Sequence, residues 1–388
     1  MNESRSDASI IDMGKALVHK EITRRQFIER ALAAGLSLSA VGSILAACGS
    51  GGSPEAGSSP DAMATDLPEK LSLFTWADYM PSSIRKSFQQ KYGIEVVESY
   101  FDSNEALTTK MSAGASGYDI IVPSNDAVHI MMKSGLLRPL DMRFIPNFKN
   151  VMTRFQKPDY DPEEDGYKYS VPYQWGTTGI GHRKDIITDP ITKYADLWNE
   201  KYKGDIIMLN DRRDVLGAGL AVLGYSLNST SQSELDQALQ KLIEQKPLVE
   251  AYDSINTKRA LVSGTPLVQG WNGYVLQAYD QLGPEKLEYV LPLEMIEVWC
   301  DNMAIPKTAP SPYAAHLFMD YLLDPKIAGE LVDYTWYSSP VPAAEEFSDP
   351  LVWSFVPTDE EMTRSEFLQD LGEFRLKYDD AWRQLKSA

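Results

Sequence analysis

The chain has 388 residues, which is too long for one ordinary hydrophobic core and indicates about two domains. Hydrophobic residues make up 43% of the sequence, enough to build such cores and to exclude a disordered chain. The formal net charge of −18 disfavours nucleic acid and anionic membranes as partners and favours cationic ligands.

The first 47 residues have the pattern of an export signal. The twin arginines Arg24 and Arg25 precede an uncharged apolar run from Ala31 to Ala47, and small residues stand directly before Cys48. This order resembles the signal and lipobox of bacterial lipoproteins, in which the cysteine receives the lipid. We therefore expect residues 1–47 to be removed and the protein to be anchored outside the cytoplasm by a lipid on Cys48. An uncleaved membrane anchor is the alternative, and the twin arginines leave the export route open between the folded-protein and general pathways.

Residues 48–66 form a Gly/Ser/Pro-rich segment without apolar periodicity, which is typical of a flexible tether. The sequence contains only two cysteines. If Cys48 carries a lipid, Cys300 is left alone and no internal disulfide can form. The fold then depends on its hydrophobic cores.

From residue 67 onward, strands and helices are expected to alternate. The expected strands are 70–76, 94–100 and 118–123, and the expected helices are 82–92, 105–113 and 127–134. This alternation predicts a parallel, doubly wound α/β sheet. Ligands of such sheets bind beyond the carboxyl ends of the strands.

A second part of similar character follows, and we see no internal repeat. Extended segments are expected at 169–173, 178–182, 205–209, 266–271, 287–293 and 297–301, helices at 233–245, 274–281 and 311–323, and a largely helical tail at 365–386. Glycines between the first two extended segments suit a stretch that crosses between two lobes.

Motifs of enzymes are largely missing. The sequence has no phosphate-binding loop, no G-x-G-x-x-G after a strand and no G-x-S-x-G nucleophile motif. Its four histidines are scattered and form no metal-ligand spacing with cysteine. Asp211 and Asp214 leave one enzymatic alternative, the acid/base pair of a carboxylate-based hydrolase.

Aromatic and acidic residues instead stand together at several expected ends of strands. Trp76 and Tyr79 flank Asp78, and Trp299 precedes Asp301 by two residues. Two further groups are Trp271 before Asn272-Gly273 and Trp336-Tyr337 before Ser338-Ser339-Pro340. Aromatic faces attract ammonium groups and pack on methylene chains, while carboxylates hold ammonium groups by charge-assisted hydrogen bonds. The combination predicts a site for a polyamine, a methylene chain that carries several ammonium groups.

From about Leu67 to Leu385 the chain resembles the periplasmic polyamine-binding proteins of bacterial ABC importers. The resembling segments are FTWADYMP (74–81), FDSNEALTTKMSAGASGYDIIVPS (101–124), PYQWGTTGIG (172–181), ADLWNEKYKG (195–204), LNDRRDV (209–215), GWNGY (270–274) and VWCDNMAIP (298–306). The resemblance implies two α/β lobes joined by crossing strands that close on a ligand between them. It implies no enzymatic activity, no cofactor and no metal, and a membrane permease with its ATPase as the partner.

The resemblance also assigns residues to the site. The family's aromatic walls fall on Trp76, Tyr79, Trp271, Trp299 and Tyr337, its acidic contacts on Asp78, Asp211, Asp214 and Asp301, and a polar contact on Ser124. Asp126 stands where one branch of the family has an aromatic residue, so a charge replaces a stacking partner. Cys300 occupies a usually apolar position and is expected to be a small buried thiol. Leu368, with Gln369 beside it, stands where the spermidine branch has an amide, which leaves the length of the ligand open.

We therefore expect a two-lobed, periplasmic-binding-protein fold in a monomer. Lobe 1 is expected to comprise 67–177 and 303–345, lobe 2 to comprise 178–302, and 346–388 to form a helical segment that packs on the lobes. The expected function is the capture of spermidine or putrescine and its delivery to an ABC importer. A binding protein of the same fold for an opine, an amino acid derivative or thiamine is the main alternative, and a polyamine sensor that docks to a membrane receptor is another.

Overall fold

The computed structural model of the chain describes residues 65–163 and 165–388. The expected export signal, the expected lipid attachment at Cys48 and the expected tether up to residue 64 lie outside the described residues. Within the described part, no helix is both long enough and apolar enough to cross a bilayer.

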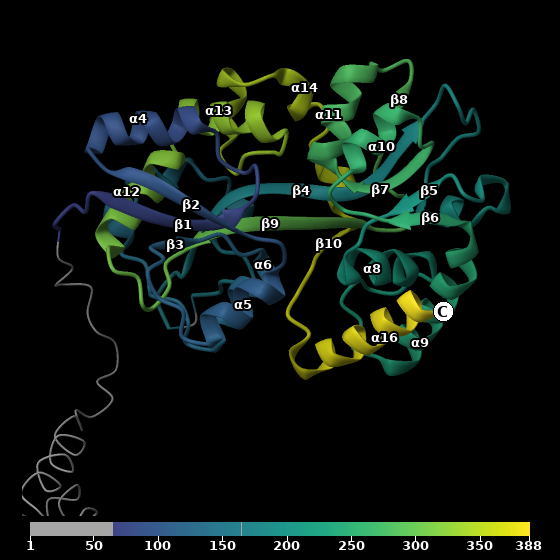
Figure 1. Cartoon of the computed structure of the whole chain (residues 1–388), viewed down its shortest axis with the longest axis horizontal. Helices are drawn as coiled ribbons and strands as arrows, with labels where there is room; N and C mark the ends of the chain where they lie inside the picture. Colours follow the sequence, from purple (N-terminus) through teal and green to yellow (C-terminus); the bar gives the residue numbers. More distant parts are fainter. Residues whose placement is uncertain (1–64, 164) are drawn as a thin grey trace, which may run out of the picture. The chain divides into compact units, whose positions relative to one another are not determined.

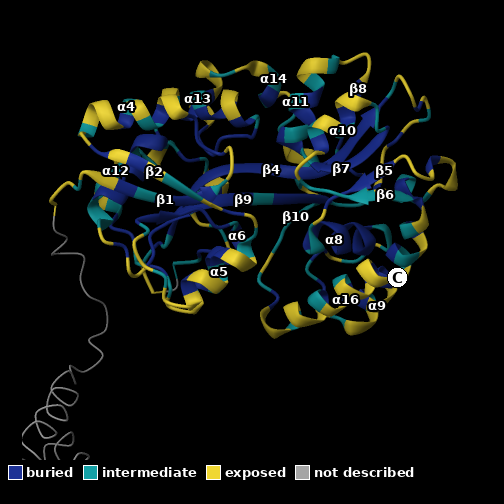
Figure 2. Cartoon of the chain, viewed as in Figure 1, coloured by how far each residue is buried: buried dark blue, intermediate teal, exposed yellow. Residues whose placement is uncertain are grey.

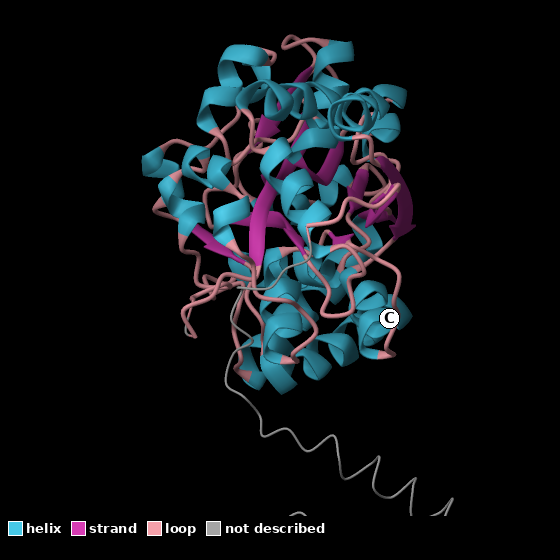
Figure 3. Ribbon diagram, turned by 90° about the vertical axis from the view of Figure 1, so that its left-hand side faces the viewer, coloured by secondary structure: helices cyan, strands magenta, loops and turns pink. Residues whose placement is uncertain are grey.

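Helices cover both faces of a single mixed sheet, with α4, α10, α11, α13 and α14 on one face and α5, α6, α8, α9 and α16 on the other (Figures 1 and 3). The strands are β1 (Lys70–Trp76), β2 (Glu95–Phe101), β3 (Ile120–Ile121), β4 (Ser170–Arg183), β5 (Ile206–Met208), β6 (Val249–Tyr252), β7 (Leu267–Trp271), β8 (Leu287–Val290), β9 (Ile296–Ala304) and β10 (Ser365–Phe367). The helices are α4 (Ser82–Tyr92), α5 (Asn104–Ser112), α6 (Asn125–Lys133), α7 (Thr153–Gln156), α8 (Arg212–Val222), α9 (Gln232–Gln245), α10 (Thr257–Ser263), α11 (Asn272–Leu282), α12 (Pro312–Leu322), α13 (Pro325–Thr335), α14 (Pro350–Trp353), α15 (Asp359–Met362) and α16 (Arg375–Ser387).

The strand order is β2-β1-β3-β9-β4-β7-β5-β6, with β10 paired to β9 and β8 paired to β4. The pairs at the two ends of the sheet, β1 with β2 and β3 and β5 with β6 and β7, are parallel as predicted. In the middle, however, β4 runs antiparallel to β9, β7 and β8. The sheet is therefore mixed rather than purely parallel, because β4 and β9 cross between the two halves in opposite directions.

Two separate hydrophobic cores show why the molecule is two-lobed. The first core draws its side chains from 71–175 and 296–344. The second core, with a smaller one beside it, draws on 180–290 and 371–385. We call the parts around them lobe 1 and lobe 2. The predicted boundaries at residues 177 and 302 fall within β4 and β9, and they stay a prediction at the level of single residues.

The crossing strands are the most deeply buried part of the sheet. All residues of β4 are buried, as are all residues of β9 except the half-buried Trp299, and both strands run through the middle of the molecule in Figure 2. A strand that is covered on both faces needs no alternation of polar and apolar residues, provided that each buried polar side chain finds a partner. Side chains of β4 and β9 are therefore held firmly where the two lobes meet.

Most expected elements are found within one or two residues, and local chemistry explains their ends. Helix α4 buries Ile84 and Phe88, one turn apart, and it ends at Gly93, whose φ of 75° is left-handed. The expected helical tail is partly wrong, because its first residues form the strand β10 on the edge of β9. The strand β6 was not expected, because half-exposed Val249–Tyr252 lacks a clear alternation.

Candidate functional site

The centre of the site is Asp301, which lies within β9 and has a relative exposure of 6%. The hydroxyl of Tyr79 donates to its Oδ2 atom at 2.6 Å, and the hydroxyl of Ser124 donates to its Oδ1 atom at 2.6 Å. Burial nevertheless raises the pKa of Asp301 to about 6, because both hydrogen bonds only partly replace lost water. The carboxylate is therefore held in place by neutral groups and not by a cation.

An aromatic cluster lies beside this carboxylate. Trp299 is two residues before Asp301 on β9, so both side chains point to the same face of the sheet. Its ring meets the ring of Tyr337 edge-on, with 4.9 Å between centroids, and Tyr337 meets Tyr79 at 5.9 Å. Gly176 on β4 makes room for the indole, since a Cβ atom there would lie 2.5 Å from Cζ2 of Trp299.

Three polar atoms in this region are buried without a hydrogen-bond partner among the described residues. They are Nε1 of Trp299 and both amide atoms of Gln174, which is paired with Asp301 across the sheet. A buried donor or acceptor without a partner costs about 1–3 kcal/mol. These atoms thus mark a place where a ligand or a water molecule would be stabilised.

Lobe 2 contributes a second buried carboxylate, Asp214, in the first turn of α8. That helix begins there because Asp211 caps it, accepting from the backbone N–H groups of Arg213 and Asp214. Oδ1 of Asp214 accepts from Oγ1 of Thr178 at 2.7 Å and from Nε1 of Trp271 at 3.2 Å. Burial, and then the neighbouring Glu297, raise the pKa of Asp214 well above its usual value.

The remaining predicted residues lie around this centre with different roles. Trp76 donates from Nε1 to the carbonyl of Val122 and packs on Phe101, so it mainly extends the core of lobe 1. Asp78 is exposed and has a left-handed φ of 54°. Burial raises the pKa of Asp126, although Arg213 opposes this effect.

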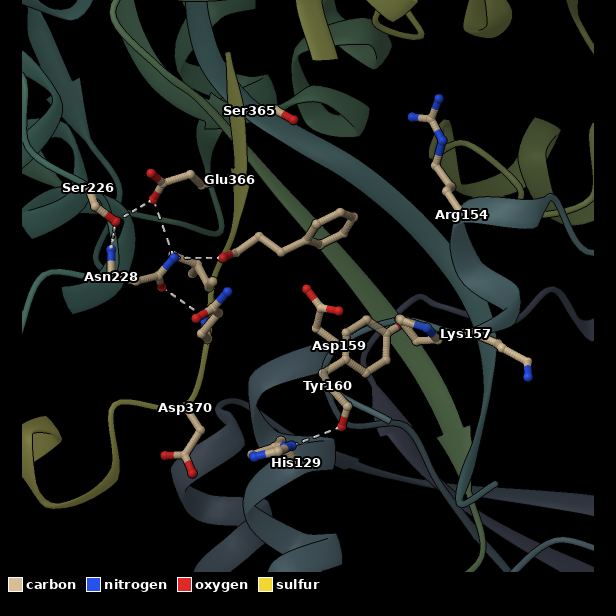
Figure 4. A pocket seen from close by; sticks show the side chains of 14 residues that line it. His129, Arg154, Lys157, Asp159, Tyr160, Ser226, Asn228, Ser365, Glu366 and Asp370 are labelled. Atoms are coloured by element: carbon tan, nitrogen blue, oxygen red, sulfur yellow. Dashed lines mark hydrogen bonds between the residues drawn. The ribbon is translucent and has the colours of Figure 1, made fainter. Parts of the chain in front are cut away.

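Two cavities are found among the described residues, and neither is lined by Asp301 or Trp299. The smaller one, of 280 Å³, is lined by Asp78, Tyr79, Tyr274, Gln277, Tyr334, Thr335 and Tyr337, and so includes three predicted site residues from lobe 1. The larger one, of 760 Å³, is lined by polar groups of both lobes and by the chain around β10 (Figure 4). It contains none of the eleven predicted ligand residues, although Leu368 and Gln369 line it.

Sequence reasoning missed three polar residues next to the predicted ones, namely Gln174, Thr178 and Glu297. All three are buried on the crossing strands. The sequence did contain a signal for Glu297. It precedes Trp299 by two residues, just as Trp299 precedes Asp301, so the alternation of a strand places all three side chains on one face. The two β4 residues emerge only from the antiparallel register, which places Thr178 opposite Glu297 and Gln174 opposite Asp301.

Cys300 lies between these side chains but faces away from the site. It is completely buried, and its thiol is free. Burial strongly raises the pKa of the thiol, which keeps it protonated and unreactive. Residues 65–163 and 165–388 contain no group of three or more His, Cys, Asp or Glu side chains that could hold a metal ion.

This combination of two lobes, crossing strands and a buried polar site between them defines the bacterial extracellular solute-binding proteins. A family model of that description matches residues 83–362, and the chain belongs to this family. The resemblance found in the sequence is thereby confirmed at the level of the family.

More particularly, the chain is 33% identical over 326 residues to the spermidine/putrescine-binding periplasmic protein of Salmonella typhimurium, covering 82% of this chain and 92% of that protein. It is 30% identical over 335 residues to the putrescine/cadaverine-binding protein of Pseudomonas aeruginosa, covering 82% of this chain and 94% of that protein. A solved structure described as a putative spermidine/putrescine ABC transporter from Listeria monocytogenes has a TM-score of 0.77 and 33% identity, with coverage of 82% of this chain and 99% of that one.

Proposed function

We propose that this protein captures a polyamine outside the cytoplasm and delivers it to an ABC importer. One observation carries the proposal. Asp214, Glu297 and Asp301 are buried, yet within residues 65–163 and 165–388 none of them forms an ion pair with a lysine, arginine or histidine. Buried charges are ordinarily paired, so this acidic, aromatic site suits a ligand that brings the positive charges.

The chemistry of a polyamine matches both kinds of group in the site. Its ammonium groups would be held by the carboxylates through charge-assisted hydrogen bonds. Its methylene chain would pack on the rings of Trp299 and Tyr337, and the faces of these rings would also attract its charges. Relatives whose names state that they bind spermidine, putrescine or cadaverine support the same class of ligand.

The alternatives have less support from the geometry. A solute with a carboxylate would need a free arginine, but Arg212 is paired with Glu105 and Asp379. Arg213 has no ion pair among the described residues, but two of its nitrogens donate to Asn228 and to the carbonyl of Gln369, and the three buried carboxyl groups outnumber it. A hydrolase would need Asp211 as an acid or a base, whereas its carboxylate caps α8.

The first prediction concerns the ligand. Titration calorimetry of the full chain should show binding of spermidine and putrescine and no binding of thiamine or of an opine. We expect spermidine to bind at least as tightly, because several carboxylates are available for its three amines. Leu368 accepts from Asn125 through its carbonyl and packs its side chain on the core of lobe 2, so it offers no side-chain amide to a distant amine. Tenfold tighter binding of putrescine than of spermidine would contradict the expected length of the ligand. The absence of binding by any polyamine would contradict the proposed function.

We further propose that the protein is a monomer anchored to the membrane through Cys48. The second prediction is that Cys48→Ser releases soluble protein or leaves the precursor uncleaved, because a hydroxyl cannot receive the thioether-linked lipid. Fractionation of cells, with gel migration as the second readout, measures this change. A variant that fractionates and migrates like the parent would show that the anchor lies elsewhere.

A further inference from the structure

Glu297 is a buried carboxyl group that the family resemblance does not assign to the site. Its relative exposure is 2%, and it lies on β9 in the same row of side chains as Trp299 and Asp301. At about 3.3 Å per residue, the row from Glu297 to Asp301 is about 13 Å long. It carries a carboxyl group at each end and an indole ring in the middle.

The hydroxyl of Thr178 joins this carboxyl group to Asp214. Oγ1 of Thr178 lies 2.7 Å from Oδ1 of Asp214 and 3.1 Å from Oε1 of Glu297. A hydroxyl group has one proton, so it can donate to only one of two carboxylates. Both hydrogen bonds are satisfied only if one of the two carboxyl groups is itself protonated and donates to the hydroxyl oxygen.

The surroundings of the pair are mostly acidic or neutral, and among the described residues no cation forms an ion pair with either carboxyl group. The titratable groups that face the pair are one carboxyl group and three phenols, namely Asp211 at the N-cap of α8, Tyr194, Tyr289 of β8 and Tyr337. Arg213 keeps its charge and favours the charged form of Glu297, but two of its nitrogens donate to Asn228 and to the carbonyl of Gln369, and it forms no ion pair with Glu297 or Asp214. Two buried carboxylates that lie this close cannot both be charged without a large cost.

We propose that Asp214 and Glu297 share one proton in the ligand-free protein, and that an ammonium group of the ligand takes the place of this proton. The inference rests on the proposed function and adds Glu297 to the ligand site. The balance is simple, because one proton leaves for solvent as one positive charge arrives. Burial raises the pKa of both carboxyl groups, in agreement with a proton that is retained near neutral pH.

The sign of the pH dependence follows from linkage. While the ligand-free pair carries a proton that the complex lacks, binding releases a proton, and the affinity rises with pH by up to about tenfold per pH unit. Asp301 also has a raised pKa, of about 6, and can add to this release at lower pH. The variant Glu297→Gln separates the two contributions, because it keeps the shape of the side chain and its hydrogen bond to Thr178 while removing the shared acid.

The experiment has a ligand-free and a ligand-bound part, both with the full chain. The infrared spectrum of the ligand-free parent at neutral pH should contain the carbonyl band of a protonated carboxylic acid. The difference spectrum between the parent and Glu297→Gln should show that the variant lacks this band. Spermidine titrations in buffers of low and high ionisation enthalpy should show about one proton fewer released by Glu297→Gln than by the parent. Glu366→Gln is the matched control, since its carboxylate is held by Ser226 and the backbone of Leu227, and it should keep both signals.

Two results would overturn the inference. A ligand-free parent without the infrared band would show that the pair holds no proton, whether or not polyamines bind. An unchanged proton count in Glu297→Gln would show that the pair takes no part in binding. If the band is present but no polyamine binds, the proposed function fails and the exchange fails with it.

Discussion

Asp301→Asn is expected to weaken polyamine binding by about 30-fold or more. The substitution keeps the shape of the side chain and removes the charge that would face an ammonium group. Loss of one partner of a buried, hydrogen-bonded charge pair costs about 2–5 kcal/mol, and each 1.4 kcal/mol is about tenfold in affinity. Tyr79 and Ser124 can still be satisfied, because one hydroxyl group keeps donating to the amide oxygen and the other can rotate to accept from the new NH₂ group.

The same substitution should stabilise the ligand-free protein at neutral pH. Burial raises the pKa of Asp301 to about 6, above the value of about 4 in an unfolded chain. The stability linked to its proton is therefore present below about pH 4 and is lost as the pH rises through 6. An asparagine at position 301 does not titrate, so the variant does not lose this stability as the pH rises. It should therefore melt at a higher temperature than the parent near pH 8, and the difference in melting temperature should shrink toward pH 4.

Asp119→Asn is a matched control for this prediction. Asp119 is equally buried and burial raises its pKa too, but each of its two carboxylate oxygens accepts from a backbone N–H group, that of Ser72 or that of Ser311, within lobe 1. An asparagine would turn an NH₂ group toward one of these donors, and we expect this loss to outweigh the gain from removing the charge. This variant should melt at a lower temperature and keep its affinity. If Asp301→Asn behaves in the same way, then Asp301 is a structural residue and the site has been placed wrongly.

Trp299→Ala is expected to have an effect of similar size through a different interaction. Removal of an enclosed tryptophan from a binding site typically costs about 2 kcal/mol or more, which is about 30-fold in the dissociation constant. The ring that meets Tyr337 would be lost, together with the free Nε1 atom. Calorimetry with spermidine measures the loss, and Trp299→Phe should recover part of the affinity because it keeps an aromatic face.

Trp353→Ala serves as the comparison for this variant. Trp353 is half-buried on α14 against the core of lobe 1, and its Nε1 atom donates to Ser348. The variant Trp353→Ala should lower the melting temperature without changing the dissociation constant for spermidine. Equal affinities for Trp299→Ala and the parent would mean that the indole only fills space between the lobes.

The sequence was sufficient for the fold class and for the centre of the site. Helix α4 could be predicted from Ile84, Phe88 and Gly93 alone, because spacing and capping are local. Trp299 and Asp301 could be placed on one face, because the alternation of a strand is local as well. The class of protein followed from segments in both lobes, and the comparisons confirm it.

What the sequence could not supply is non-local. The register of β4 against β9 brings Thr178 to Glu297 and Gln174 to Asp301 from more than a hundred residues away, and no periodicity encodes that meeting. The strand β10 forms because an edge of β9 is open to it, although its own residues gave no strand pattern. The assignment of Trp76 to an aromatic wall stays a prediction, and its contacts with Val122 and Phe101 likewise come from segments that its own sequence neighbourhood does not reveal.

Each of the two cores is assembled from segments that lie far apart in the sequence, and this limits when each lobe can fold. Lobe 1 needs side chains up to residue 344, and lobe 2 needs Tyr378 and Leu385 of α16, which are completely buried. During synthesis neither core can be completed until nearly the whole described chain has left the ribosome. Contacts between such distant segments also form slowly. The interleaved path thus delays folding by its topology alone, and it leaves apolar segments of both lobes exposed until synthesis of the chain is nearly finished.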